Sequence, residues 1–208
     1  MYIPANMEID DPVELREFIS TFSFATLVSS DLQATHMPLV LEPDSGEHGA
    51  LIGHFARANR HWKKLDGSQV LVMFWGPHTY ISPTWYADAP AVPTWNYAAV
   101  HVTGQLSLCN AEGTTAILDK MMGHYEPQLL RDRDVVTHDI QAKMLGAIVG
   151  FRIAIETIEG KQKLGQLRSE GDQRGVTSAL TRSDRRDAQE LLDFMKHKRL
   201  GLGDNHEE

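Results

Sequence analysis

The segment from Gly53 to Trp62 combines the end of an expected strand, a turn and several basic side chains. The strand is expected to end near Phe55 and a short helix to begin at Asn59. Free N–H groups in such a turn, beside a guanidinium, suit a dianion, because Arg can hold a phosphate through two parallel hydrogen bonds. The turn therefore predicts a phosphate site on Arg57, completed by Asn59 or by helix N–H groups. The alternative is that the basic residues between positions 57 and 64 form only a solvated face.

Ten histidines in 208 residues raise the question of a metal or a haem. A zinc site on a helix needs two His four residues apart or at a similar fixed spacing. His54 and His61 are seven apart, His36, His78 and His101 lie on separate segments, and no H-E-x-x-H is present. These spacings disfavour a dedicated metal site, and haem held by a single His stays an alternative.

Aromatic residues and prolines alternate between positions 75 and 97. The aromatic residues are Trp75, Tyr80, Trp85, Tyr86, Trp95 and Tyr97. Prolines fix extended loops, and aromatic rings supply area for burial or stacking. Core packing is the first interpretation of this stretch, and a subunit interface or a planar heteroaromatic ligand are the alternatives.

Composition excludes several classes of protein. Lys and Arg number 20 and Asp and Glu 28, so the net charge of −8 argues against bulk binding to nucleic acid or anionic lipid. The single Cys109 excludes an internal disulfide framework and a Cys-based zinc site. No Gly-rich phosphate loop and no G-x-S-x-G is present, and no carboxylate pair stands out. No apolar run approaches the roughly 20 residues of a membrane helix, and Met1–Pro4 lacks the features of a signal peptide. We therefore expect a cytoplasmic protein with one main domain.

Short apolar runs separated by turn residues predict a mainly β protein of α+β type. The expected strands are Phe24–Ser29, Ala34–Leu41, Ala50–Phe55, Gln69–Trp75, His78–Ser82, Tyr97–Leu108 and Ala147–Ile158. Pro38 cannot donate to a ladder, so its strand is expected to be an edge or irregular. Val70–Trp75 is apolar on both faces, which predicts that both are covered, by the barrel interior and by a helix or partner subunit. Six or seven such strands suggest a closed or nearly closed antiparallel barrel.

Helices are expected before, between and after these strands. Asp11 and Pro12 begin one whose apolar face ends at Phe22, and two more lie between the last two long strands. A C-terminal helix is expected over 184–199, with an apolar stripe of Ala188, Leu191, Leu192 and Met195. We expect residues 1–180 to form the main domain, 181–200 the C-terminal helix and 201–208 a disordered tail.

Five blocks of sequence resemble the PaiB family of FMN-binding negative transcriptional regulators. They are Met1–Pro4, Ala34–Leu39, Gly53–Trp62, Tyr80–Tyr86 and Val92–Tyr97. Lys161–Gly175, with K-L-G-Q-L-R-S, resembles the C-terminal signature of that family. Gly165 and Leu167 stand where the family pattern has Ser and Asn, so two polar side chains are absent there.

The resemblance implies an FMN-binding split β-barrel, related to the pyridoxamine 5′-phosphate oxidase fold, with flanking helices and a C-terminal helix. It also implies a homodimer with FMN at the subunit interface. On the phosphate side it implies His36, His54, Ala56, Arg57 and Asn59. Near the flavin ring or the ribityl chain it implies Ser82 and Trp85, with Lys163 and Gln166 closing the site.

Three functions follow from this resemblance and from the residues. The first is a dimeric FMN-binding protein with a negative regulatory role in transcription. The second is an FMN-dependent oxidoreductase of the flavin reductase or oxidase kind, in which the cofactor supplies the chemistry. The third is a haem-binding split barrel, suggested by the ten histidines. Direct DNA binding has weak support, because no helix-turn-helix is apparent and the basic residues near the C-terminus also fit a solvated helix face.

Overall fold

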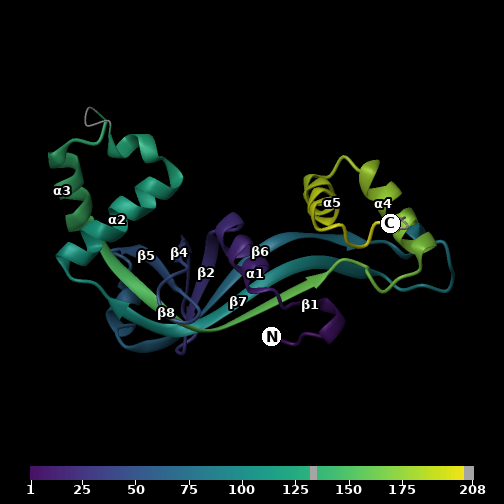
Figure 1. The fold of residues 1–208 in the computed structure, drawn as a ribbon, viewed down its shortest axis with the longest axis horizontal. Coiled ribbons are helices and arrows are strands. Elements are labelled where there is room, and N and C mark those ends of the chain that lie inside the picture. The colour runs from purple at the N-terminus through teal and green to yellow at the C-terminus, as the bar shows by residue number, and fades with distance from the viewer. Residues whose placement is uncertain (132–134, 204–208) are drawn as a thin grey trace. The chain divides into compact units, whose positions relative to one another are not determined.

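The structure, a computed structural model, describes residues 1–131 and 135–203 and forms a mainly antiparallel sheet with flanking helices (Figure 1). Within these residues the strands are β1 (Glu8–Ile9), β2 (Phe24–Ser29), β3 (Ala34–Pro38), β4 (Val40–Glu42), β5 (Ala50–Ala56), β6 (Ser68–Ile81), β7 (Thr94–Leu108) and β8 (Ile148–Lys163). The α-helices are α1 (Pro12–Thr21), α2 (Ala111–Tyr125), α3 (His138–Ala147), α4 (Glu170–Thr181) and α5 (Arg186–Lys198). Short 3-10 helices are η1 (Ala5–Met7), η2 (Arg60–Lys64), η3 (Pro83–Trp85) and η4 (Pro127–Leu130).

The strand order is β3-β2-β6-β7-β8-β5-β4, with β1 added on β8. Between the described strands this order has two ends, β3 and β4, so the sheet is open and has the form of a half-barrel. The predicted class, mainly β with flanking helices, is confirmed, whereas full closure of the barrel is not observed.

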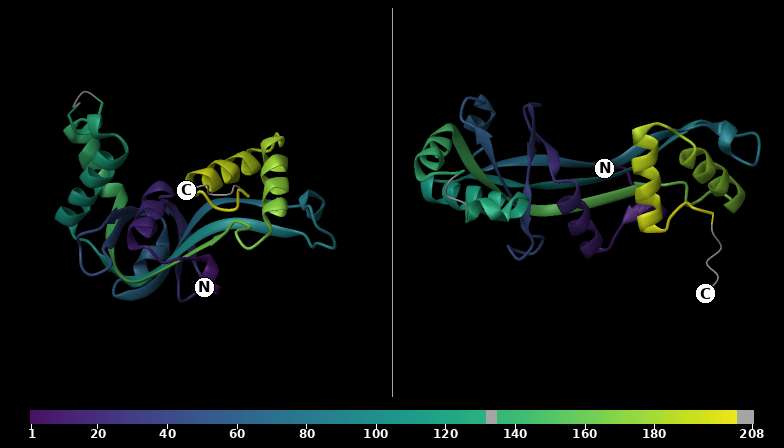
Figure 2. Two further views of the ribbon diagram at one scale, coloured as in Figure 1. Left: turned by 45° about the vertical axis from the view of Figure 1, so that its right-hand side comes forward. Right: turned by 90° about the horizontal axis from the view of Figure 1, so that it is seen from above.

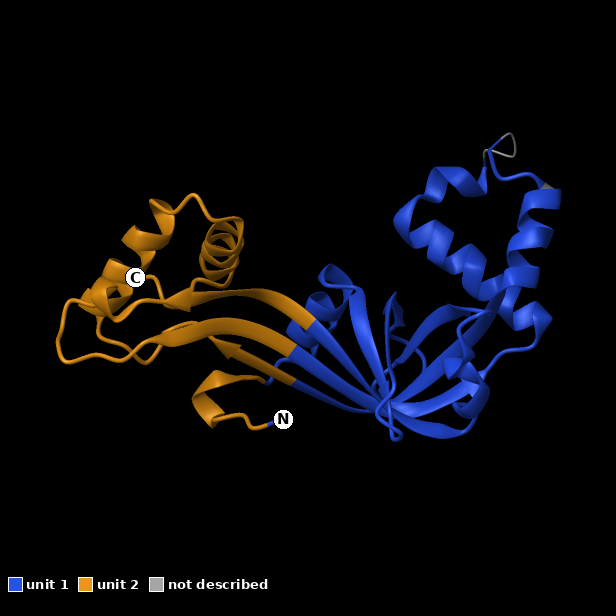
Figure 3. Cartoon of the chain, turned by 180° about the vertical axis from the view of Figure 1, so that it is seen from behind, with its two compact units in different colours: residues 1, 10–74, 100–159 blue, residues 2–9, 75–99, 160–208 orange. Residues whose placement is uncertain are grey.

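The chain groups into two compact units that alternate along the sequence (Figure 3). Unit 1 holds residues 1, 10–74 and 100–159, and unit 2 holds 2–9, 75–99 and the chain from 160 onward. Strands β6, β7 and β8 contribute residues to both units. The boundary that we expected near residue 180 stays a prediction. Most of the tail expected to be disordered, residues 204–208, lies outside the described residues.

Strand β6 corrects one sequence prediction. We expected two separate strands, Gln69–Trp75 and His78–Ser82, but Ser68–Ile81 is one strand of 14 residues. Strand β2 pairs with β6 only from Val70 to Phe74. Beyond Phe74 that edge of β6 has no partner from β2, and an open edge tolerates a residue without an N–H. Pro77 therefore interrupts no ladder to β2.

The two faces of the Val70–Trp75 run differ in burial. Val70, Val72 and Phe74 are buried, whereas the side chain of Trp75 is 53% exposed. Leu71 and Met73 are half-buried. The chain by itself therefore covers one face fully, and the cover of Trp75 by a partner subunit stays a prediction.

Helix α1 begins where the sequence indicated. The Asp11 carboxylate accepts a hydrogen bond from the N–H of Val13 at 2.8 Å, and Pro12 occupies the first turn. Leu15, Phe18 and Ile19 are buried, as expected from their spacing. The cap and the apolar stripe together explain why this short segment is helical.

In unit 2, α4 lies beside α5, as the views in Figure 2 show. All four residues of the predicted apolar stripe of α5 are buried. The Asp187 carboxylate accepts a hydrogen bond from Thr79 Oγ1 at 2.6 Å, so the first turn of α5 is attached to β6. The pKa of Asp187 is lowered mainly by its hydrogen bonds with Arg185 and then Thr79, which keeps it ionised.

Helix α4 also holds the segment that follows β6. The Asp172 carboxylate accepts hydrogen bonds from the N–H groups of Ala87 at 3.0 Å and Asp88 at 3.2 Å. A Cβ atom added at Gly175 would lie 2.0 Å from the carbonyl oxygen of Trp85. Only glycine permits this approach of helix to backbone, so the C-terminal signature fixes the segment around residues 85–88.

We predict that Gly175→Ala destabilises the protein, by roughly 1–3 kcal/mol, because the added methyl group must displace the backbone at Trp85. Gly146→Ala is the matched control, because Gly146 is also helical and a Cβ there meets no atom within 4 Å. The control is expected to be neutral or to stabilise by up to about 1 kcal/mol. Thermal and urea unfolding measure both changes, and equal melting temperatures would contradict the close approach.

Candidate functional site

The turn after β5 forms as the sequence predicted. Strand β5 ends at Ala56, and the N–H of Asn59 donates to the Ala56 carbonyl at 2.9 Å. Asn59 caps η2, since its Oδ1 accepts from the N–H of His61 at 3.1 Å. Residues 56–60 therefore make a tight turn at the entry of a short helix.

Arg57 is anchored to the chain that joins α3 and β8. Its Nε donates to the Gly146 carbonyl at 2.8 Å, and its Nη2 donates to the Ile148 carbonyl at 2.7 Å. The backbone N–H of Arg57 donates to the Ala147 carbonyl at 2.7 Å. The two side-chain bonds use two of the five N–H donors of the guanidinium, and the two hydrogens on Nη1 take no part in them. Arg57 is thus an exposed cation in a fixed orientation with donors left for an anion.

The two histidines predicted on the phosphate side differ. His54, on β5, is half-buried, and its Nδ1 is buried without a hydrogen-bond partner among the described residues. Burial lowers the pKa of His54, so its ring is neutral near pH 7. His36, on β3, is exposed, and its Nδ1 lies 2.9 Å from Thr26 Oγ1. The unpartnered nitrogen of His54 is the kind of gap that a ligand or a water fills.

Lys163 and Gln166 lie in unit 2, and their side chains form hydrogen bonds with other residues of that unit. The Lys163 ammonium donates to Thr94 Oγ1. The Oε1 of Gln166 accepts from the N–H of Leu164 at 2.8 Å, and its Nε2 donates to the Asn6 carbonyl at 3.1 Å. Gln166 therefore ties the N-terminal segment to the turn after β8.

Ser82 and Trp85 lie at η3, also in unit 2. The Oγ of Ser82 accepts from the N–H of Thr84 at 3.2 Å and so caps η3. Trp85 is half-buried, with its carbonyl against Gly175. The structure brings His54, Ala56, Arg57 and Asn59 together along β5 and its turn. It places Ser82, Trp85, Lys163 and Gln166 in unit 2.

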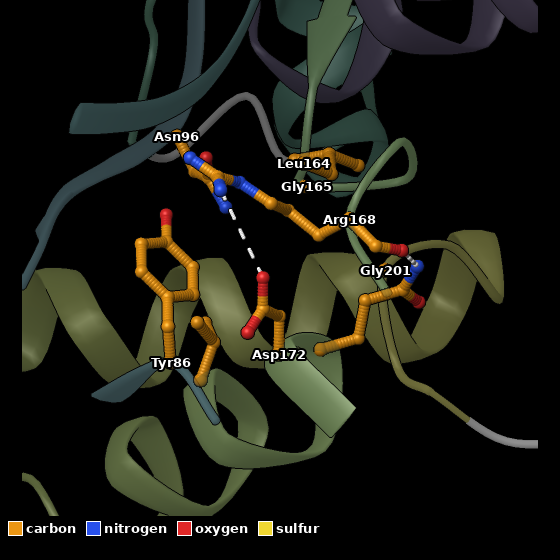
Figure 4. A pocket seen from close by; sticks show the side chains of 9 residues that line it. Tyr86, Asn96, Leu164, Gly165, Arg168, Asp172 and Gly201 are labelled. Carbon is orange, nitrogen blue, oxygen red and sulfur yellow. Dashed lines mark hydrogen bonds and ion pairs between the residues drawn. The ribbon is translucent and has the colours of Figure 1, made fainter. Parts of the chain in front are cut away.

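The C-terminal signature contains a small pocket that sequence reasoning missed (Figure 4). The Arg168 guanidinium lies over the Tyr86 ring, 4.4 Å from its centroid, and 3.8 Å from the buried Asp172 carboxylate. Burial raises the pKa of Tyr86. The pocket encloses about 10 Å³, the space of about one water, so it does not hold a flavin. Its lining is Tyr86, Asn96, Leu164, Gly165, Arg168, Asp172, Gln173, Val176 and Gly201.

The two departures from the family pattern have local explanations. Gly165 has φ +82°, a conformation in which glycine avoids the steric cost of a side chain. Leu167 is 59% exposed. In this chain, neither position turns a side chain into the core of unit 2.

A larger groove lies in unit 1, with a volume of about 540 Å³, within the range of ligand sites. On its wall, the Glu42 carboxylate accepts from both Lys120 and Arg152. No sequence motif pointed to this groove. Its lining is Val40, Leu41, Glu42, Pro43, Asp44, Ser45, Ile52, Lys120 and His124.

Comparisons with known proteins identify the family. Residues 1–157 match the family model FMN_bind_2, described as "Putative FMN-binding domain". The chain belongs to this FMN-binding family. It is 35% identical over 206 residues to "Protease synthase and sporulation protein PAI 2" of Bacillus subtilis, covering 95% of this chain and 98% of that protein. An uncharacterized protein of Emericella nidulans is 31% identical over 189 residues, covering 71% and 74%. The predicted membership of the PaiB family and FMN as its cofactor are confirmed.

Solved structures share the fold at low sequence identity. The flavocytochrome Anf3 of Azotobacter vinelandii has a TM-score of 0.61 at 15% identity, covering 79% of this chain and 73% of that chain. The FAD and heme binding protein of Mycobacterium smegmatis has a TM-score of 0.57 at 16% identity, covering 76% and 74%. These likenesses confirm the split-barrel flavoprotein fold.

Two features of the described residues bear on other classes of function. None of the helices in the described ranges is long and apolar enough to span a membrane. Residues 1–131 and 135–203 contain no group of three or more His, Cys, Asp or Glu placed to hold a metal ion.

We predict that the melting temperature falls as the pH is lowered from 7.5 to 5.5. Burial is the main cause that lowers the pKa of His54, His61 and His101 below their ordinary value of 6.5. The unfolded chain therefore binds protons near pH 6.5 that the folded chain binds only at lower pH, and stability decreases as the pH falls through that window. Scanning calorimetry at several pH values measures the effect. His54→Gln is expected to reduce the slope, and a melting temperature that rises on acidification would contradict the prediction.

Proposed function

We propose that this protein binds the phosphate of FMN at the turn after β5, with Arg57 as its main ligand. The observation that carries the proposal is the guanidinium of Arg57, which two backbone carbonyls hold in one orientation. A side chain that is already ordered loses less entropy when it binds, and a guanidinium–phosphate pair is a strong charge-assisted interaction. The phosphate needs a fixed cation with free donors, and Arg57 fits this need.

Other residues of the turn complete the phosphate side of the proposed site. Asn59 holds the turn at the entry of η2, and one of its Nδ2 hydrogens takes no part in its bond to Thr35. His54 offers the unpartnered Nδ1 on β5. We assign His36 and Ala56 to this side as well, because β3 and β5 are in contact and Ala56 ends β5. This donor set, one cation with neutral polar groups, suits a phosphate dianion.

We assign the ring and ribityl side to Ser82, Trp85, Lys163 and Gln166, as the family resemblance implies. Trp85 offers aromatic surface and Lys163 a cation, while Ser82 and Gln166 fix the two turns that carry them. FMN supplies electron transfer through its isoalloxazine ring when it is bound.

We propose that the protein acts as a homodimer. Three large aromatic side chains on β6 and β7 of unit 2 are exposed, Trp75 by 53%, Trp95 by 44% and Tyr80 by 39%. Core packing, our first interpretation of these aromatic residues, is therefore wrong for these three. The Trp95 side chain has a partner in the same unit, since its Nε1 donates to His78 Nδ1 at 3.3 Å. Exposed aromatic rings are typical of interfaces, which supports pairing through these side chains.

We propose a cytoplasmic negative regulatory role in transcription, supported by the relative whose name refers to protease synthase and sporulation. The basic side chains of α4 and α5 favour an indirect route over direct DNA contact. Arg174, Arg185 and Arg186 are each paired with an acidic side chain of the same region, so they present little free positive charge. FMN-dependent turnover with a nicotinamide would instead favour an oxidoreductase.

Arg57→Ala tests the phosphate site. Loss of the charge-assisted pair is expected to cost about 2–3 kcal/mol, which weakens FMN binding by roughly 30- to 150-fold. Riboflavin, which lacks the phosphate, should bind the wild type and Arg57→Ala with equal affinity. Arg60→Ala is the matched control, because Arg60 is an exposed Arg of the same turn region. Flavin fluorescence titration measures the dissociation constants, and an unchanged value for FMN would remove Arg57 from the site.

The visible spectrum and gel filtration of the purified protein test the cofactor and the dimer together. We expect the two absorption bands of oxidised flavin in a peak with the mass of a dimer. Trp95→Glu should shift that peak to the monomer, whereas Val13→Glu, a control at another exposed apolar residue, should not. A colourless protein that ignores added FMN would contradict flavin binding, and a Soret band would favour the haem alternative.

A further inference from the structure

A chain of polar groups, with the buried His61 at its centre, lies behind the turn that carries Arg57. His61 is only 5% exposed, and its two ring nitrogens contact two hydroxyl groups. Its Nδ1 lies 2.8 Å from Thr35 Oγ1, and its Nε2 lies 2.7 Å from Ser29 Oγ. Asn59 Nδ2 donates to Thr35 Oγ1 at 3.2 Å, and Ser29 Oγ donates to Asp31 Oδ1 at 2.5 Å. A continuous hydrogen-bonded path therefore runs from Asp31 to Asn59.

The chemistry of the groups fixes the direction of every bond in this path. The hydrogen bond from Ser29 is the main cause that lowers the pKa of Asp31, so this carboxylate is ionised and only accepts. Since the Ser29 hydroxyl donates its hydrogen bond to Asp31, the Ser29 oxygen must accept from His61 Nε2–H. A neutral imidazole has one N–H, so Nδ1 accepts, and the Thr35 hydroxyl donates to it. Burial lowers the pKa of His61, which agrees with a neutral ring.

The path holds Asn59 from both ends of its amide. The Nδ2 group donates to Thr35 Oγ1, while Oδ1 accepts from the backbone N–H of His61. The His61 ring itself meets the edge of the Phe55 ring, with centroids 5.8 Å apart. Ring and backbone of one residue thus fix the side chain that caps η2 and, through it, the turn that presents Arg57.

We propose that His61, as the neutral Nε2–H tautomer, is a positioning residue for the phosphate of the flavin. It does not touch the phosphate, and it acts by holding Asn59 and the turn of Arg57 in the binding conformation. This inference rests on the proposed phosphate site. It adds a second group of side chains, Ser29, Thr35 and His61, on which that site depends.

Thr35→Val and Thr35→Ser form the matched test. Val keeps the shape of Thr but removes the hydroxyl that links His61 to Asn59, whereas Ser keeps the hydroxyl. We expect Thr35→Val to weaken FMN binding by about 5- to 10-fold with little change for riboflavin, and Thr35→Ser to bind as the wild type does. His61→Gln should resemble Thr35→Val, and the Thr35 pair carries the test if that variant does not fold. Equal losses for FMN and riboflavin would show a merely structural role and overturn the proposal.

The tautomer is measured independently of binding. Long-range proton–nitrogen NMR spectra of the protein labelled at histidine should show the proton of His61 on Nε2. A proton on Nδ1, or a doubly protonated ring at pH 7, would overturn the direction of the path. If Arg57→Ala weakens FMN binding and Thr35→Val does not, only this inference fails. If Arg57→Ala has no effect, the proposed phosphate site fails, and this inference fails with it.

Discussion

The backbone hydrogen bonds of three long strands organise this protein. β6, β7 and β8 have 14, 15 and 16 residues, and the shorter strands pair with only part of them. β2 pairs with β6 from Val70 to Phe74, and β5 pairs with β8 from Ile148 to Ala154. β1 pairs with two residues near the end of β8. Edges left open by the short strands tolerate residues such as Pro77. The same pairing brings the end of β5 next to the start of β8, where Arg57 finds its carbonyl partners.

The anchoring of Arg57 explains how an exposed side chain can serve as a ligand. A free Arg on a surface samples many rotamers and loses that freedom on binding. Here the carbonyls of Gly146 and Ile148 have already removed most of it, at the junction of α3 and β8. The hydrogen-bonded path through His61 fixes the other side of the same turn. The side-chain partners of Arg57 are neutral carbonyls, so its positive charge stays available for an anion.

The C-terminal signature stabilises backbone more than it presents ligands. Asp172 accepts from two successive N–H groups, Gly175 admits the Trp85 carbonyl, and Gln166 ties the N-terminal segment. The Asp172 carboxylate is itself buried, and the two N–H groups from which it accepts offset the cost of burying its charge. Leu167 stands where the family pattern has Asn, and because its side chain is exposed, these contacts stay intact.

The sequence alone determined those features that depend on neighbours along the chain. The Asp11 cap, the bounds of β2, the stripe of α5 and the turn at Asn59 follow from spacings of a few residues, and the family from extended blocks. Only the tertiary structure decided the continuity of β6, the exposure of Trp75, the partners of Arg57 and the burial of His61. Arg57 meets carbonyls about 90 positions away, and His61 meets a serine 32 positions away. No local pattern encodes such contacts, because strand pairing across the sheet brings them together.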